Sequence, residues 1–210
     1  MKYPVYSTMI LCGLLFLISG CSRYVCWAQK TFKQAPELGI SVAPARAYLR
    51  SEYVYDQFST VGLFDALWLT NTVRDTAHRI YAARWSMDAD MLEEILDNQH
   101  TENYNTLSFY LLIAPEENNF VTLSNAQAEW SIVLDVDGTY YLPRTIQEVD
   151  LDPQYRLIFG KLYSHFKVPY LITFEAFDDQ ERAVISTKTQ KVRLVLRSVN
   201  YTAALVWCLH

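Results

Sequence analysis

Histidines and carboxylates are the side chains of this sequence that could form a metal site or a general acid–base pair. The four histidines are His78, His100, His165 and His210, and no two have the spacing of three to five residues that places metal ligands on one side of a helix. Asp75 precedes His78 by three residues, so within a helix its carboxylate could orient the imidazole. A solvated helix pair explains the same residues, and we therefore expect no metal or catalytic role for them.

Asp135, Asp137 and Gly138 have the spacing that begins a calcium-binding loop, because alternate aspartates can aim oxygens at one cation. An EF-hand loop also requires Gly at its sixth position and Glu at its twelfth, where this sequence has Tyr140 and Ile146. Asp-Gly between two alternating segments is also a strong β-hairpin signal. The segment therefore predicts a hairpin, with no metal and no cofactor.

Motifs of the common hydrolases and nucleotide-binding enzymes do not occur in this sequence. It contains no Gly-x-Ser-x-Gly segment, no phosphate-binding loop and no dinucleotide fingerprint, and it has only six glycines. No Cys-x-x-Cys pair suggests redox chemistry. We therefore expect a protein without enzymatic activity.

The first 21 residues have the pattern of a bacterial export signal. Lys2 precedes an apolar run at 9–18, which is shorter than the roughly 20 residues of a membrane-spanning helix and fits the apolar part of a signal peptide. The sequence Ile-Ser-Gly-Cys at 18–21 resembles the lipobox of bacterial lipoproteins. That resemblance implies cleavage between Gly20 and Cys21 and a lipid on the Cys21 thiol. The alternatives are a buried terminal helix and an ordinary signal peptide cleaved elsewhere.

The same resemblance gives an address in the cell envelope. Ser22, in the place where Asp would favour the inner membrane, implies sorting to the outer membrane, without specifying its periplasmic or surface face. The two or three acyl chains of a lipoprotein hold a protein firmly on a bilayer. We expect residues 1–20 to be the signal peptide, 21–50 a lipidated tether, and 51–210 one β-rich domain with a helical insertion at about 71–99.

Two cysteines would remain unmodified in the exported chain. Cys12 leaves with the signal peptide and Cys21 carries the lipid, so Cys26 and Cys208 are candidates for a disulfide in the oxidising envelope. A bridge requires their Cα atoms to lie within about 7 Å. Two isolated thiols are the alternative.

The composition is that of a globular protein that does not bind nucleic acid. Hydrophobic residues make up 51% and charged residues 20% of the chain. The formal net charge is −5, and loss of Lys2 makes it more negative. This charge repels phosphate backbones.

Alternating apolar residues predict a mainly β domain. Strands are expected at 61–69, 107–113, 130–136, 139–146, 170–177, 192–198 and 201–207. The first is a central strand because both of its faces are apolar. Phe64, Ala66 and Trp68 share one face, and Leu63 and Leu67 share the other. Short strands joined by turns indicate an antiparallel β-sandwich, immunoglobulin-like in one version, with about three helices.

Three helices are expected between these strands. The first is capped by Thr70 or Asn71 and carries an apolar stripe, and the second is capped by Asp88 and should bury an apolar side. Asp152 and Pro153 begin the third. The two sets of expected buried residues are Val73, Ala77, Ile80 and Tyr81, and Met91, Leu92, Ile95 and Leu96.

This layout resembles a group of uncharacterised bacterial lipoproteins that have a β-rich envelope domain after the lipobox. The shared features are a Phe-x-Ala-x-Trp-Leu strand at 64–69, a Val-Arg helix at 73–74, and a later strand and hairpin with Trp130, Gly138 and Pro143. These are packing residues, so the resemblance implies an address and a fold and no activity.

The leading functional hypothesis is a non-enzymatic, lipid-anchored module that binds an envelope protein. An edge strand or the helical pair at 72–98 would form the contact. The second hypothesis is a glycan- or lipid-binding module that uses aromatic residues around a cleft. The third is an enzyme whose site is assembled by the fold, which would need His78 or His165 to meet a carboxylate in a pocket.

Overall fold

Strand β2 (Ser59–Trp68) alternates large apolar residues on both faces, and it occupies an inner position in a five-stranded antiparallel sheet. The computed structural model describes residues 39–57, 59–114, 123 and 128–209. The sheet has the order β1-β2-β3-β7-β6. Its other strands are β1 (Leu49–Asp56), β3 (Thr106–Ala114), β7 (Val168–Glu175) and β6 (Thr145–Glu148).

A second antiparallel sheet of four strands packs against the first, so the fold is mainly β and sandwich-like, with helical insertions. Its order is β5-β4-β8-β9. Its strands are β5 (Thr139–Tyr141), β4 (Ser131–Val136), β8 (Lys191–Arg197) and β9 (Thr202–Cys208). The first three strands of the chain form a meander in one sheet, whereas an immunoglobulin fold places its second and third strands in opposite sheets. The strand order found therefore differs from that of an immunoglobulin fold.

The strand expected at 139–146 is divided between the two sheets. β5 pairs with β4, and after residues 142–144 the chain continues as β6, which pairs with β7 in the other sheet. Pro143 lies at this crossing. A proline cannot donate a ladder hydrogen bond, so it favours an interruption of the strand at this place.

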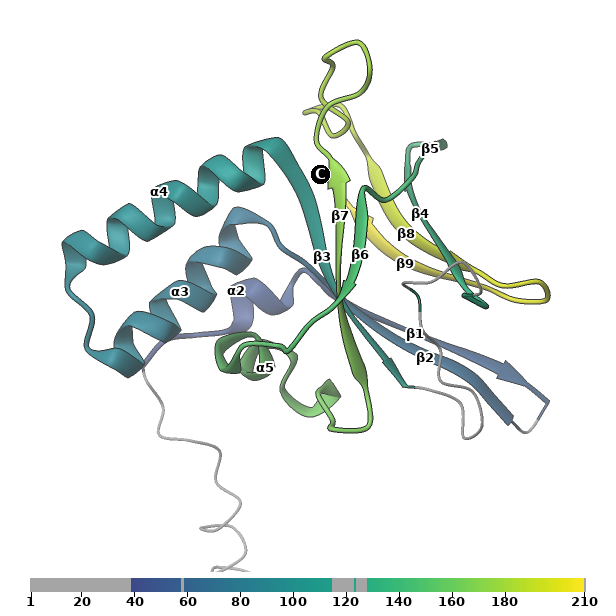
Figure 1. Ribbon diagram of the computed structural model, residues 1–210, viewed down its shortest axis with the longest axis horizontal. Coiled ribbons are helices and arrows are strands. Elements are labelled where there is room, and N and C mark those ends of the chain that lie inside the picture. The colour runs from purple at the N-terminus through teal and green to yellow at the C-terminus, as the bar shows by residue number, and fades with distance from the viewer. Residues whose placement is uncertain (1–38, 58, 115–122, 124–127, 210) are drawn as a thin grey trace, which may run out of the picture. The chain divides into compact units, whose positions relative to one another are not determined.

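Helices cover one face of the five-stranded sheet and form a third layer (Figure 1). They are α2 (Ala43–Arg46), α3 (Asn71–Trp85), α4 (Ala89–Asn105), α5 (Pro153–Phe159) and a 3-10 turn, η1 (Gly160–Leu162). Asp152 precedes α5 and Pro153 is its first residue, as expected. α2 and the start of β1 fall in the segment expected to be a tether, and Ala45 is fully buried. The β-rich unit therefore begins at Ile40, earlier than the predicted residue 51.

Two apolar cores follow from the two faces of the inner strands. Phe64, Ala66 and Trp68 of β2 lie in the core between the sheets, while Leu67 lies in the core beneath the helices. This confirms the predicted central strand. No helix of the described residues has the length and apolar composition needed to cross a membrane.

A charged cluster interrupts the face of β2 that lies beneath the helices. Asp65 is fully buried between Leu63 and Leu67 in sequence, and its carboxylate accepts hydrogen bonds from the Lys167 ammonium and the Ser51 hydroxyl. The Lys167 side chain is 12% exposed. Burial of an unpaired carboxylate costs folding free energy. The ion pair with Lys167 offsets this desolvation cost for Asp65.

Two edge strands, β1 and β9, are joined by side chains where the sheets meet. Arg50 Nε donates to the carbonyl of Val206 at 2.8 Å, and the Trp207 indole donates to the carbonyl of Tyr48 at 2.8 Å. These bonds hold the start of the folded chain against its last strand.

Candidate functional site

The residues proposed for lipid attachment, Gly20 and Cys21, lie outside the residues that the structure describes, and so does Cys26. Cys208 ends β9 and is exposed. No other cysteine belongs to the described part of the chain. The candidate bridge between Cys26 and Cys208 therefore stays a prediction.

The acidic hairpin uses its carboxylates to shape its own turn. Asp137 and Gly138 both have positive φ angles, 48° and 94°, as a two-residue type I′ turn requires. Asp135 accepts from the Gly138 amide at 2.8 Å and from the Arg193 guanidinium, and Asp137 accepts from the Lys191 amide at 2.9 Å. The predicted hairpin is confirmed. Among the described residues no group of three or more candidate ligands is placed to hold a metal.

The histidines do not meet carboxylates where the sequence suggested. The Asp75 carboxylate accepts from the His100 imidazole across the two helices, with 2.7 Å between Asp75 Oδ1 and His100 Nε2, so its hydrogen-bond partner is not His78. His165 is exposed and lies beside the Tyr163 ring. His210 lies outside the described residues.

The helical pair α3–α4 is the insertion expected at about 71–99, and only α3 is embedded in the core. Val73 and Ala77 are fully buried and Ile80 is 4% exposed, as predicted, whereas Tyr81 is 37% exposed. α4 begins at its predicted cap, where the Asp88 carboxylate accepts from the Ala89 amide at 2.6 Å.

No residue of α4 is buried. The predicted buried side is therefore found only in part, because Leu92, Ile95 and Leu96 are half-buried whereas Met91 is 57% exposed. The physical reason is that α4 lies outside α3 (Figure 1), so that α3 covers one side of it and the other side faces solvent.

Polar contacts join α4 to α3. The Arg74 guanidinium is almost fully buried and donates to the Gln99 side chain, and its Nη1 lies 3.5 Å from a Glu102 carboxylate oxygen. Arg74 Nε also donates to the carbonyl of Leu69 at 3.4 Å. These hydrogen bonds to a buried cation help to hold α4 against α3, beside its half-buried apolar side chains.

Burial shifts the pKa values of three groups in or near this helical pair, His78, Tyr110 and Tyr155. Burial lowers the pKa of His78, and contact with Gln99 opposes this only in part. The Nε2 atom of His78 is buried without a hydrogen-bond partner among the described residues. Burial also raises the pKa of Tyr110 to about 12 and that of Tyr155 further still. The two phenols are therefore protonated at neutral pH.

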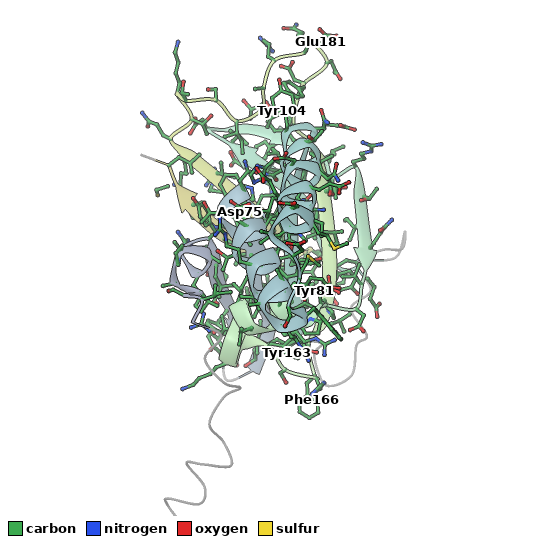
Figure 2. The ribbon with its side chains drawn as sticks, turned by 90° about the vertical axis from the view of Figure 1, so that its left-hand side faces the viewer. Asp75, Tyr81, Tyr104, Tyr163, Phe166 and Glu181 are labelled. Atoms are coloured by element: carbon green, nitrogen blue, oxygen red, sulfur yellow. The ribbon has the colours of Figure 1, made fainter. Side chains whose placement is uncertain are left out.

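Large apolar side chains are exposed where α3 turns into α4. We define the tip surface as Tyr81, Trp85 and Met91, which are 37%, 65% and 57% exposed. The rings of Tyr81 and Trp85 lie 6.3 Å apart, centroid to centroid. Figure 2 views the helical layer face on, with Tyr81 near its lower end. Exposed apolar groups that gather in this way are typical of a contact surface.

A pocket lies at the other end of α4. It has a volume of about 430 Å³ and is enclosed by the last turn of α4, the first residue of α3 and the segment after β7. His100 lies in its wall, paired with Asp75. Sequence reasoning missed this pocket. Asn71, Asn103 and Tyr104 of the lining had no motif to mark them, and the aromatic content was the only signal.

Comparison with known proteins adds little to this description. No protein-family model matches the chain, and no curated protein matches it. It is similar to a crystal structure of a novel protein of unknown function from Burkholderia pseudomallei K96243, with 14% sequence identity. The likeness covers 80% of this chain and 81% of that one, with a TM-score of 0.41. A likeness this distant carries no argument about function.

Proposed function

We propose that this chain is a lipid-anchored protein of the bacterial cell envelope that acts without enzymatic chemistry, by binding another protein through the tip surface. The lipid anchor is supported by the lipobox-like residues 18–21. The binding role is supported by one observation above all. α4 is a helix of 17 residues of which none is fully buried, and the end of α3 that precedes it exposes a tryptophan and a tyrosine.

Charge around the tip surface favours a particular kind of partner. On the α4 side the charges are all acidic, at the N-cap Asp88 and in the first half of the helix at Asp90, Glu93, Glu94 and Asp97, whereas Arg79 and Arg84 are exposed on the α3 side. An interface commonly has an apolar centre and a polar rim, and complementary charge guides the encounter. The partner would therefore present an apolar hollow surrounded by lysine or arginine residues.

Replacing Cys21 by alanine tests the anchor. A fatty-acid analogue fed to growing cells should label the wild-type chain and leave Cys21→Ala unlabelled, with the leader still attached, because the thiol is the lipid acceptor. Cys26→Ala is the matched control and should keep the label. Equal labelling of Cys21→Ala and wild type would contradict the proposal.

Replacing Ser22 by aspartate tests the address. Fractionated envelopes should contain the wild-type chain in the outer membrane and Ser22→Asp in the inner membrane, since Asp at this place favours retention there. Ser22→Ala is the control that should stay in the outer membrane. An unchanged distribution of Ser22→Asp would remove the support for outer-membrane sorting.

Site-directed photocrosslinking tests the protein contact. A photoreactive amino acid at Trp85 should give one dominant crosslinked species in intact envelopes, whereas the same group at Val199, which is 95% exposed, should not. Adding Glu93→Lys should weaken the adduct because it reverses a charge of the rim. The same adducts from both positions, or none from Trp85, would refute a specific contact at the tip surface.

A further inference from the structure

The pocket at the far end of α4, which we call the end pocket, has one apolar wall. Ala176, Phe177, Ala183 and Ile185 form this wall, and Trp68 and Leu107 lie deeper. Its volume of about 430 Å³ falls in the range of small-molecule sites, about 300–1,000 Å³. The wall can therefore accept one flat apolar face of a small ligand.

Backbone and carboxylate hydrogen bonds hold this wall in place. Phe177 and Ala183 pair as an isolated antiparallel bridge, and the Val184 amide donates to the Ala176 carbonyl at 2.8 Å. Asp178 accepts from the backbone amide and the Nε of Arg182, at 2.9 and 2.8 Å. The wall is thus formed before any ligand arrives, which lowers the cost of binding.

The rim of the end pocket offers an aromatic platform. The Tyr104 side chain is 69% exposed, and its ring lies 5.3 Å from that of Phe177, tilted by 60°. Figure 2 shows Tyr104 at the upper end of the helical layer, away from Tyr81. An exposed ring beside an apolar wall gives a ligand a second surface on which to stack.

The opposite wall is polar and carries no unpaired charge. The side-chain amides of Asn71 and Asn103 lie 2.6 Å apart, and the Asn103 amide nitrogen donates to the Leu69 carbonyl at 2.7 Å, so the remaining donor and acceptor capacity is mainly that of Asn71. His100 uses Nε2 for Asp75, at 2.7 Å, which leaves Nδ1 for a ligand. No lysine, arginine, aspartate or glutamate lines the pocket. Anionic and cationic ligands therefore find no counter-charge here, while hydroxyl and amide groups find partners.

We propose that the end pocket binds a neutral pyranose unit of a glycan. A pyranose ring presents an apolar C–H face, which would stack on Tyr104 and Phe177, and a rim of hydroxyl groups, which would bond to Asn71, Asn103 and His100. A simple acyl chain would leave the remaining donors and acceptors of these side chains unused and displace the water that bonds to them, which costs free energy. This site is separate from the tip surface, and either could function without the other.

Calorimetric titration of the purified full-length protein tests this inference. The protein is kept in a detergent without a sugar headgroup. The probes are the β-1,4-linked disaccharides of N-acetylglucosamine and of glucose, with indole and hexanoate as non-sugar probes. Saturable binding of a disaccharide and none of indole or hexanoate is the expected result.

Two variants and a control locate the binding. Tyr104→Ala removes the platform and should weaken disaccharide binding by roughly tenfold, as expected for a stacking contact. Ala183→Trp fills the pocket from an exposed position and should abolish binding. Tyr140→Ala removes a comparably exposed tyrosine of the other sheet and should change nothing. Equal binding by both pocket variants and wild type, preferential binding of indole or hexanoate, or no saccharide binding up to about 10 mM would overturn the proposal.

Discussion

Removing the ammonium of Lys167 should destabilise the fold more than most single substitutions. Asp65 is fully buried, and the Lys167 side chain is 12% exposed, so Lys167→Met leaves a buried carboxylate with only Ser51 beside it. Breaking a buried ion pair in this way costs about 3–5 kcal/mol. For a domain of this size a loss of 1 kcal/mol lowers the Tm by about 2–4 °C, so we expect a fall of about 6–20 °C. Circular dichroism during heating at neutral pH measures it.

A double variant separates the lost charge pair from lost packing. Asp65→Leu combined with Lys167→Met replaces both charges by apolar groups and should recover most of the stability, because the desolvation cost disappears with the charges. Lys161→Met, at an exposed lysine of η1, is the control and should leave the Tm nearly unchanged. The reasoning fails if Lys167→Met melts with the wild type, or if the double variant is as unstable as the single one.

Three further predictions concern His78, the β4–β5 turn and the remaining cysteines. Burial lowers the pKa of His78 below its ordinary 6.5, so at a pH near 6.5 this side chain binds more protons in the unfolded chain than in the folded one. The free energy of unfolding should therefore fall as the pH drops from neutral through 6.5. The fall should be less steep in His78→Gln than in the control His165→Gln, and urea-unfolding midpoints at each pH measure it. Gly138→Ala should cost about 1–2 kcal/mol because its φ of 94° disfavours a side chain, and an unchanged urea midpoint would contradict this. If Cys26 and Cys208 form a bridge, intact-mass analysis will find both alkylated only after reduction, and alkylation of both beforehand excludes the bridge.

Local patterns predicted most of the strands because each strand carries its own signal. The turn at Asp137 and Gly138 was predicted because a type I′ turn needs residues that tolerate positive φ. The inner position of β2 followed from apolar residues on both faces. β1 was missed, because its alternation is weak and the nearby Pro44 suggested irregular chain. The break at Pro143 was also missed, because the alternating pattern continues across it.

The helical layer shows where sequence reasoning stops. The spacing of Met91 and Ile95 predicted a buried side, but spacing says which residues share a face and not whether another element covers that face. The pairing of Asp75 with His100 depends on how two helices pack side by side, and neither residue marks the other. Likewise, the end pocket brings together Tyr104 and Phe177, which are 73 positions apart in sequence. Their contact depends on the tertiary fold, and no local pattern predicts it.

The junction of β1 with β9 bears on the time at which the chain can complete its fold. Arg50 and Val206 are 156 positions apart in sequence, and Tyr48 and Trp207 are 159 apart. The Trp207 ring also packs 5.9 Å from Trp68 and 5.4 Å from Phe109, in the core between the sheets. The ribosome makes the amino-terminal part of the chain first, so these contacts cannot form until β9 has been made. Contacts between residues so far apart in sequence also form slowly.

The inner core therefore remains open until the last strand has been made. During that time the polypeptide is an unfinished sheet with apolar surface uncovered, a state that binds holding chaperones and aggregates without them. The bonds that join the two ends of the domain therefore form late, and the fold is completed only when its final residues have been made.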